Sequence, residues 1–231
     1  AATPSGDEVL RKVDRQANAF SDASFTFVMK VYDPGQVREV QFMTLQKGTQ
    51  KRLVRFLAPG DIKGMGFLME SADTMYALLP AFGNRVRRLG THQQRSQSFM
   101  GSDVLTDDMS AVEFNTAYAA TVAGNDGDAV VLNLTLRPGQ QSDFPKLKLW
   151  VDPKLSTLRK IEYYDNSGKK LRTQERTDFR KDDKSDYWAP FKMTFIDHRR
   201  NDHKTELILS QRALNTGLSD GEFTVRALQR N

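Results

Sequence analysis

The sequence predicts a mainly β protein built on a single antiparallel sheet or barrel. Apolar and polar residues alternate with a period of two through most of the chain, as in strands that bury one face. Short turn sequences such as Asp33-Pro34-Gly35 and Asn166-Ser167-Gly168 separate these stretches. The sequence shows neither alternating strand and helix patterns nor an internal repeat, which favours antiparallel meanders over a parallel α/β fold.

The first element of the chain is predicted to be a helix. Ser5 can cap the first helical amides while Glu8 bonds back to the backbone, which is the pattern of a capping box. Apolar residues then recur at helical spacing from Val9 to Phe20. We therefore expect one amphipathic helix over residues 6–20.

Strands make up most of the rest of the chain. Their signature is a period of two, bounded by glycine, proline, asparagine or aspartate. The predicted strands are 24–32, 37–46, 51–58, 67–69, 75–79, 85–89, 129–136, 146–152, 158–164, 170–179, 189–197 and 204–213. Residues 103–111 begin with an aspartate cap and an acidic first turn, which predicts a helical turn. Residues 223–228 are predicted to close the chain as a short strand or a turn of helix.

Composition limits the class of protein. With 231 residues the chain is expected to form one domain over 1–231, since single β domains commonly reach this length. It has no cysteine, so neither a disulfide framework nor a thiolate metal site is expected. No apolar run approaches the ~20 residues of a membrane-spanning helix. The small residues Ala1, Ala2 and Thr3 are compatible with the end that signal peptidase leaves.

Residues 197–203 contain two histidines and two carboxylates, as a metal site would. Arg199 and Arg200 lie between them, and two cations disfavour a divalent ion, so no metal and no cofactor is expected. The glycines from Gly60 to Gly66 lack the lysine and serine of a P-loop, and Gly101-Ser102-Asp103 is not a nucleophile elbow. The sequence therefore does not indicate an enzyme.

The formal net charge is +5, with a sequence pI near 9.4, which favours anionic partners. Basic strands with aromatic residues, such as the one with Lys148 and Trp150, could stack nucleic-acid bases. Acidic residues interrupt these strands, and no continuous positive groove is expected. No nucleic-acid partner is predicted, and a solvated outer face explains most of the basic residues.

Apolar residues of the first half of the chain are a further feature. The chain has eight methionines and fourteen phenylalanines, and most of them precede residue 110. Flexible methionine and large aromatic rings can line a cavity that adapts to ligands of irregular shape. The same residues can equally fill a core, and composition alone does not separate the two alternatives.

Residues 56–108 resemble a known family. The motif elements follow a fixed order: Phe56-x-x-Pro59, Gly64-x-Gly66-Phe67-Leu68, Leu79-Pro80-Ala81, Arg85-Val86-Arg87-Arg88, Ser98-Phe99-Met100-Gly101-Ser102-Asp103 and Asp107-Asp108. They are similar to those of the outer-membrane lipoprotein-sorting-like proteins, which belong with the LolA/LolB group. The resemblance implies a curved antiparallel sheet that forms an unclosed barrel, with the N-terminal helix and short helices on its concave side.

The resemblance also implies a function: a non-enzymatic periplasmic carrier that binds lipoprotein acyl chains or lipid in a hydrophobic cavity. The helix 9–20 and the segment 103–111 would act as lids over it. The residues expected to bind lipid, assigned by strand parity, are Phe25, Phe27, Met29, Phe42, Val54, Phe56, Phe67, Met69, Tyr76, Leu78 and Trp150. Arg85, Arg87 and Arg88 are expected to contact an anionic headgroup or an acidic partner.

Partners and an alternative follow from the same resemblance. An inner-membrane exporter is the expected protein partner, the chain is expected to be monomeric, and its signal peptide is expected to be removed in the periplasm. The alternative is a non-enzymatic interaction subunit of a membrane export complex, with the same sheet but an interior filled by its own helices. A co-purifying lipid would favour the carrier.

Overall fold

A computed structural model of the protein describes residues 4–71, 73–83, 85–90, 96–109 and 113–230. Residues 1–3, on which the signal-peptidase expectation rests, lie outside this range, as do the last residues of the predicted lid segment 103–111.

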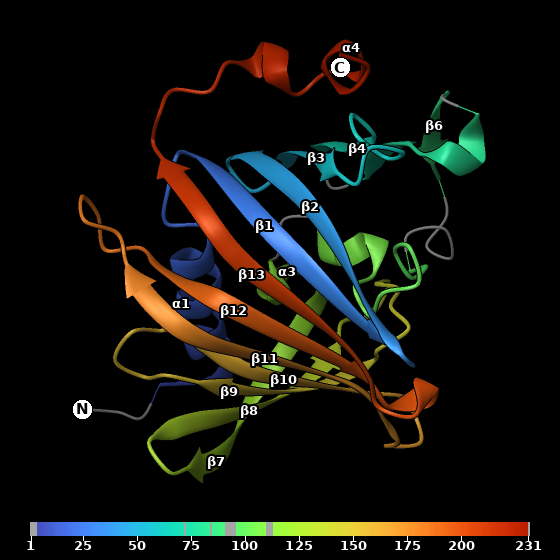
Figure 1. Cartoon of the computed structure of the whole chain (residues 1–231). Helices are drawn as coiled ribbons and strands as arrows, with labels where there is room; N and C mark the ends of the chain where they lie inside the picture. Colours follow the sequence, from blue (N-terminus) through green and yellow to red (C-terminus); the bar gives the residue numbers. More distant parts are fainter. Residues whose placement is uncertain (1–3, 72, 84, 91–95, 110–112, 231) are drawn as a thin grey trace. The chain divides into compact units, whose positions relative to one another are not determined.

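Thirteen strands of the described residues form one sheet (Figure 1), in the order β6-β5-β4-β3-β2-β1-β13-β12-β11-β10-β9-β8-β7. They are β1 (Asp22–Asp33), β2 (Gln36–Lys47), β3 (Lys51–Ala58), β4 (Gly66–Ser71), β5 (Thr74–Leu78), β6 (Val86–Leu89), β7 (Tyr118–Asp126), β8 (Ala129–Leu136), β9 (Lys146–Val151), β10 (Leu158–Tyr164), β11 (Lys170–Lys181), β12 (Trp188–Asp197) and β13 (His203–Leu214). The order ends at β6 and β7, so the sheet is not closed into a barrel.

Helices are few and, after the first, short. They are α1 (Gly6–Ala17), α3 (Phe114–Ala117), α4 (Val225–Leu228) and the 3₁₀ turns η1 (Pro80–Phe82), η2 (Thr106–Met109), η3 (His198–Arg200) and η4 (Asp220–Glu222). The predicted fold class is therefore confirmed: mainly β, with one antiparallel unclosed sheet, an N-terminal helix and short helices. No helix of the described residues is long and apolar enough to cross a membrane.

Two elements differ most from the sequence-based expectation. The first helix ends at Ala17 instead of Phe20, because Phe20 already belongs to the bend before β1, where its ring lies 5.9 Å from that of Phe25. Strand β7 was not predicted. Its second half is fully exposed, so it lacks the alternation of buried and exposed residues by which a strand is recognised.

The chain divides into two compact units, residues 1–19 with 112–204 and residues 20–111 with 205–231. The first contains α1, α3 and β7 to β12, and the second contains β1 to β6, most of β13 and α4. The single domain over 1–231 stays a prediction.

In the first unit, α1 starts with the predicted capping box. The Ser5 hydroxyl accepts the Glu8 N–H, and the Glu8 carboxylate accepts the Ser5 N–H at 2.8 Å. The helix lies directly on edge strand β7, since a β-carbon built on Gly6 would come within 2.4 Å of the Ala120 carbonyl oxygen. The Asp7 carboxylate accepts the Ala120 N–H at 2.8 Å and so covers a polar group of the sheet edge.

Asp14 joins α1 to α3 in the same unit. Its two carboxylate oxygens accept the backbone N–H groups of Phe114 and Asn115 at 2.9 and 2.8 Å. Burial raises the pKa of the Asp14 carboxyl from 3.8 to about 6, although these two N–H groups lower it, and the charge of Glu113 raises it further. Folding thus disfavours the ionised form relative to the unfolded chain, although the carboxyl group is still mostly ionised at neutral pH.

We expect Asp14 to make the first unit more stable at acidic pH. Its contribution to the free energy of unfolding is full below pH 3.8 and is lost as the pH rises through about 6. Asp14→Asn removes this titration. When the pH is lowered from 7 to 4, the free energy of unfolding of the wild type, measured with urea, should rise by about 1–2 kcal/mol relative to that of the variant. A difference that stays constant over this pH range would contradict the expectation.

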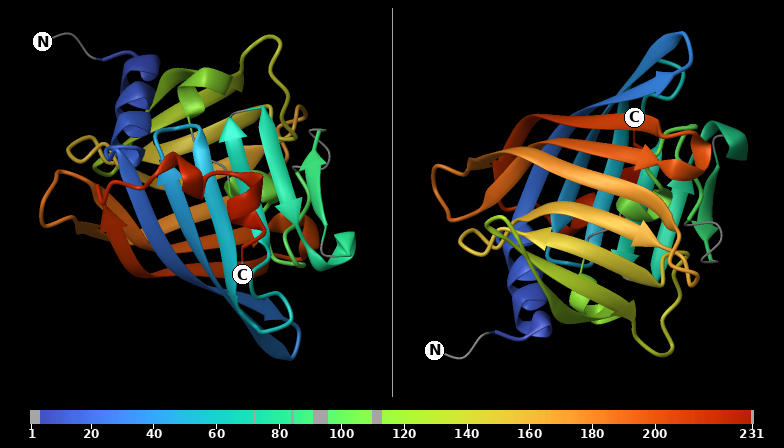
Figure 2. Two further views of the ribbon diagram at one scale, coloured as in Figure 1. Left: turned by 90° about the horizontal axis from the view of Figure 1, so that it is seen from above. Right: turned by 90° about the horizontal axis from the view of Figure 1, so that it is seen from below.

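In the second unit, the C-terminal segment covers one face of the sheet. Phe223 and Leu228 pack on leucines of four neighbouring strands: Leu45, Leu53, Leu68 and Leu78. The left view of Figure 2 shows this segment in red over the blue and cyan strands. Lys47 and Lys51 both pair with Asp220, at 3.1 and 2.9 Å, and thereby hold the segment in place. The other face of these strands is apolar and forms part of the candidate site.

Candidate functional site

The second unit has an apolar face, which is the side of β1 to β5 opposite the C-terminal segment. Direct cross-strand pairs place its residues together, for example Phe27 with Phe42 and Phe42 with Phe56. The pairs Val54 with Phe67 and Met69 with Met75 continue it across β4 and β5. Its members are Phe25, Phe27, Met29, Phe42, Val54, Phe56, Phe67, Met69, Met75 and Ala77.

Phenylalanine rings form a continuous row across this face. The ring centroids of Phe27 and Phe42 are 5.3 Å apart, and those of Phe42 and Phe56 are 6.1 Å apart. Phe67 stands edge-on to Phe56 at 6.2 Å. Rings at these separations attract one another beyond their burial, so the row is a rigid apolar wall.

The segment from Ser98 to Met109, here called the capping segment, lies on the apolar face. The Phe99 ring stacks on Phe56 at 4.7 Å, with an interplanar angle of 6°. Two arginines hold the backbone of the segment: Arg38 donates to the Met100 carbonyl and Arg52 to the Met109 carbonyl, both at 3.0 Å. The segment is thus both packed and tethered.

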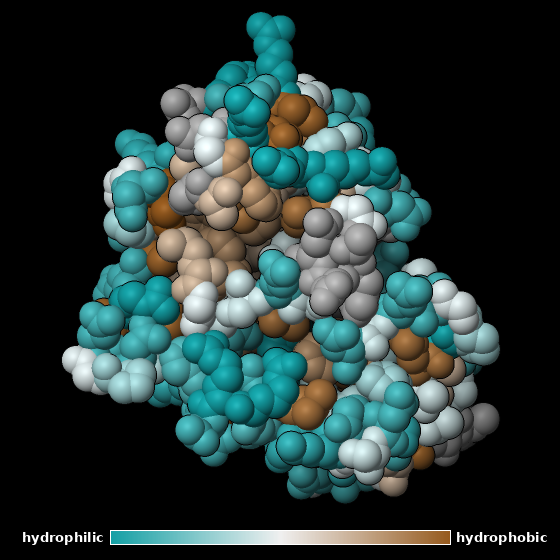
Figure 3. Space-filling model, turned by 90° about the vertical axis from the view of Figure 1, so that its right-hand side faces the viewer, coloured by the Kyte–Doolittle hydropathy of each residue, from teal (hydrophilic) through white to brown (hydrophobic). Residues whose placement is uncertain are grey.

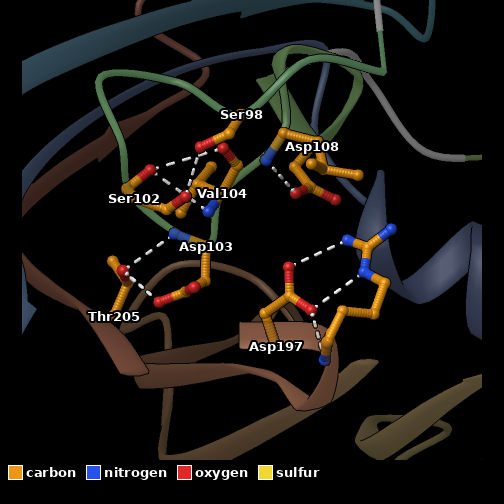
Figure 4. Close-up of polar contacts among 9 residues, drawn as sticks. Ser98, Ser102, Asp103, Val104, Asp108, Asp197 and Thr205 are labelled. Carbon is orange, nitrogen blue, oxygen red and sulfur yellow. Dashed lines mark hydrogen bonds and ion pairs between the residues drawn. The ribbon is translucent and has the colours of Figure 1, made fainter. Parts of the chain in front are cut away.

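Asp103 and Thr205 provide a third, buried tether (Figure 4). The Thr205 hydroxyl accepts the Asp103 N–H at 2.9 Å and donates to the Asp103 carboxylate at 2.8 Å. Asp103 is 2% and Thr205 0% exposed. Because a buried carboxylate needs hydrogen-bond donors, this pair fixes where the capping segment meets β13.

A pocket of about 490 Å³ opens between the capping segment, β6 and the β3–β4 turn. Its base is formed by rings of the apolar face and of the capping segment, and its mouth by exposed residues. The lining residues are Phe56, Ile62, Met65, Phe67, Leu79, Ala81, Phe82, Leu89, Gln97, Ser98, Phe99, Met100 and Thr106. Figure 3 shows a hollow of apolar, tan and brown atoms in the upper half of one face of the molecule.

Most of the residues predicted to bind lipid come together. Eight of them lie on the apolar face: Phe25, Phe27, Met29, Phe42, Val54, Phe56, Phe67 and Met69. Of these, Phe56 and Phe67 line the pocket. Tyr76 and Leu78 are on the opposite face, since Tyr76 pairs with Leu68 and packs under the C-terminal segment. The binding role of all of them stays a prediction.

Trp150, the remaining residue of that set, belongs to the first unit. It lies on β9, on the side opposite the buried Leu147 and Leu149. Its indole N–H donates to Asp126 at 2.9 Å, and the Lys160 ammonium lies 4.3 Å from the ring centroid. These contacts are typical of a polar, half-exposed sheet face.

The three predicted headgroup arginines are exposed, but they are placed differently. Arg87 is on the same side of β6 as the pocket residue Leu89, and its guanidinium lies 5.5 Å from the Phe82 ring centroid at the pocket. Arg88 pairs with Tyr76, on the side of the C-terminal segment. Arg85 precedes the strand. Of the three guanidinium groups, that of Arg87 is placed beside the pocket by its contact with the Phe82 ring.

The pocket lining includes residues outside the predicted set. Ile62, Met65, Ala81 and Phe82 come from the β3–β4 turn and from η1, and Phe99 comes from the capping segment. Residues in turns and loops do not alternate between two faces, so a period of two could not predict which of them line the pocket. The available signals were the motif around Leu79-Pro80-Ala81 and Phe99-Met100 and the abundance of Phe and Met before residue 110.

The histidine-rich stretch 197–203 forms a hydrogen-bonded turn. His198 Nδ1 bonds Asp202, and its Nε2 bonds the Thr173 hydroxyl at 2.8 Å. Burial alone would raise the pKa of Asp197, but the Arg199 side chain and N–H lower it below its usual range (Figure 4). The described residues hold no group of three or more potential metal ligands. Thr173 is only 5% exposed, so its hydroxyl is not open to a substrate.

A family model described as an uncharacterized protein matches residues 48–230. No curated protein matches the chain.

Three solved structures cover nearly the whole chain. A DUF1329 family protein from Desulfovibrio piger has a TM-score of 0.85 at 23% identity, over 98% of this chain and 100% of its own. A domain assigned to outer membrane lipoprotein sorting from Vibrio parahaemolyticus has a TM-score of 0.83 at 25% identity, and the match covers 97% of this chain and 98% of that domain. A LolA superfamily protein from Nitrosomonas europaea has a TM-score of 0.81 at 21% identity, and the match covers 97% of this chain and 100% of that protein. The chain therefore belongs to the family of that model, and it is similar in fold to a LolA superfamily protein and to an outer membrane lipoprotein-sorting domain.

Proposed function

We propose that this protein is a non-enzymatic carrier that binds the hydrocarbon chain of a lipid or lipoprotein in the pocket of the apolar face. The pocket is the observation on which the proposal rests. Its volume of about 490 Å³ lies within the range of about 300–1,000 Å³ of small-molecule sites. Six of its thirteen lining residues are Phe or Met, and Met side chains in particular adapt to a flexible apolar ligand.

The energetics of such a ligand need no catalytic group. Burial of a methylene in an apolar site contributes about 0.8 kcal/mol, so ten methylenes contribute about 8 kcal/mol before the entropy of binding is subtracted. An interior of this kind can take up a chain and release it again when the capping segment moves. The lipoprotein-sorting name of the Vibrio relative supports the same class of ligand.

The place of action follows from the same relatives. We propose that the protein works in the periplasm as a monomer and exchanges its ligand with an inner-membrane exporter. The LolA-like fold and the lipoprotein-sorting relative support a periplasmic carrier. Sedimentation of the purified protein and crosslinking in cells are the measurements for the monomer and the membrane partner.

Filling the pocket should abolish binding. Ala81 is exposed and lines the mouth, so Ala81→Trp places an indole in the pocket without disturbing the core. We expect binding of the uncharged fluorescent probe N-phenyl-1-naphthylamine to weaken at least about tenfold, because the indole takes volume that the probe needs. Native mass spectrometry should show a co-purifying lipid on the wild type and less on the variant.

Ala213→Trp is the matched control. Ala213 is exposed in the same unit, on β13, and does not line the pocket. It should bind the probe like the wild type. Equal binding by wild type and both variants, with no lipid co-purifying, would favour the alternative of an interaction subunit of an export complex.

A further inference from the structure

The size of the pocket limits how many chains it can hold. A volume of about 490 Å³ lies in the lower half of the range of about 300–1,000 Å³ over which a pocket binds one small molecule. This is the size class of one hydrocarbon chain, not of two or three. Two or three chains need two or three times that volume, and the space beside the pocket is already filled by the rings of Phe56, Phe67 and Phe99, which are buried and in mutual contact.

A positive charge lies beside the pocket. None of the lining residues is acidic. Arg87 lies over the ring of the lining residue Phe82, which holds the guanidinium beside the opening. No carboxylate of the described residues is within ion-pair distance of Arg87, whereas Arg38, Arg159, Arg180 and Arg199 all have such a partner. The Arg87 guanidinium is thus available to an anion from outside the chain.

We infer that the ligand of this pocket is a single hydrocarbon chain with an anionic head, whose carboxylate or phosphate the Arg87 guanidinium contacts at the mouth. This inference rests on the proposed function and narrows its ligand class. The planar guanidinium fork matches the oxygen pairs of carboxylate and phosphate. A long-chain fatty acid and a lysophospholipid share this chemistry, and both have one chain.

The test compares ligands on the full chain by displacement of N-phenyl-1-naphthylamine. The ligands are palmitate, 1-palmitoyl lysophosphatidic acid, uncharged hexadecanol, and dipalmitoyl phosphatidylglycerol in vesicles. We expect both single-chain anions to bind more tightly than hexadecanol, with an advantage that shrinks as salt is raised. The diacyl lipid should compete poorly. The ranking of palmitate against the lysophospholipid tells whether carboxylate or phosphate is preferred.

Arg87→Gln and Arg88→Gln form a matched pair on one strand. They remove the same charge, but Arg88 is on the side of the C-terminal segment, away from the pocket. R87Q should weaken palmitate binding about threefold to fivefold and leave hexadecanol binding unchanged. R88Q should change neither.

Each contrary result has a defined meaning. Equal effects of R87Q and R88Q on palmitate, or equal wild-type affinity for palmitate and hexadecanol, would overturn the anionic head. Native mass spectra with two or more chains per protein, or strong competition by the diacyl lipid, would overturn the single chain. Failure of every ligand, hexadecanol included, would overturn the proposed function itself.

Discussion

Replacing Gly66 by alanine is expected to lower the free energy of unfolding by more than about 3 kcal/mol. A β-carbon at this position would lie 1.8 Å from the Val54 carbonyl oxygen and 2.8 Å from its carbonyl carbon. Both are backbone atoms of β3, so no side-chain rotation relieves the clash and the two strands must separate. Glycine here permits a close approach of two backbones.

The control for this variant is Gly60→Ala in the same β3–β4 connection. A β-carbon there meets no atom within 4 Å, so the change should stay within about 0.5 kcal/mol of the wild type. Urea unfolding of both variants is the measurement. Because Phe67 follows Gly66 and lines the pocket, G66A should also lose probe binding. Equal stability of G66A and G60A would show that the strands move apart at little cost.

The fold could be predicted further than the site. Alternation with a period of two, together with the apolar run Phe67 to Met69, located twelve of the thirteen strands. Most of them bury one face more than the other, and β4 buries both faces of its first half. It missed β7, whose residues from Thr121 to Asp126 are all exposed. The capping box of Ser5 and Glu8 marked the start of α1 correctly, since it is local chemistry that depends on no distant contact.

Alternation assigns residues of two neighbouring strands to the same face only where the register between the strands is known. Residues from Phe25 to Met69 fall on one face because β1 to β4 pair without a change of side. Between β4 and β5 the register shifts after Met69. Alternation counted from Phe67 therefore predicted Tyr76 on the same face as Phe67, whereas Tyr76 pairs with Leu68 and lies on the opposite face. The pocket itself is built mainly from turns, whose residues have no periodicity.

Thr205→Val is expected to destabilise the second unit by about 2–4 kcal/mol and to free the capping segment. Valine keeps the shape of threonine but removes the hydroxyl that both accepts the Asp103 N–H and donates to the Asp103 carboxylate. Asp103 is 2% exposed, so water does not replace the lost bonds without local opening. The charged oxygen and the N–H would both lose a partner in a buried place.

Thr205→Ser separates this hydrogen-bonding effect from packing, because serine keeps the hydroxyl and loses only a methyl group. T205S should be destabilised by about 1 kcal/mol, much less than T205V. Amide hydrogen exchange adds a local readout: the amides of Phe99 and Ser102 bond carbonyls within the capping segment and should lose protection in T205V alone. If T205V and T205S unfold at the same urea concentration and protect these amides equally, the Asp103–Thr205 pair does not hold the segment. Faster exchange together with faster release of N-phenyl-1-naphthylamine in T205V would connect this tether to opening of the pocket, because the freed segment also supplies Phe99 and Met100 to its lining.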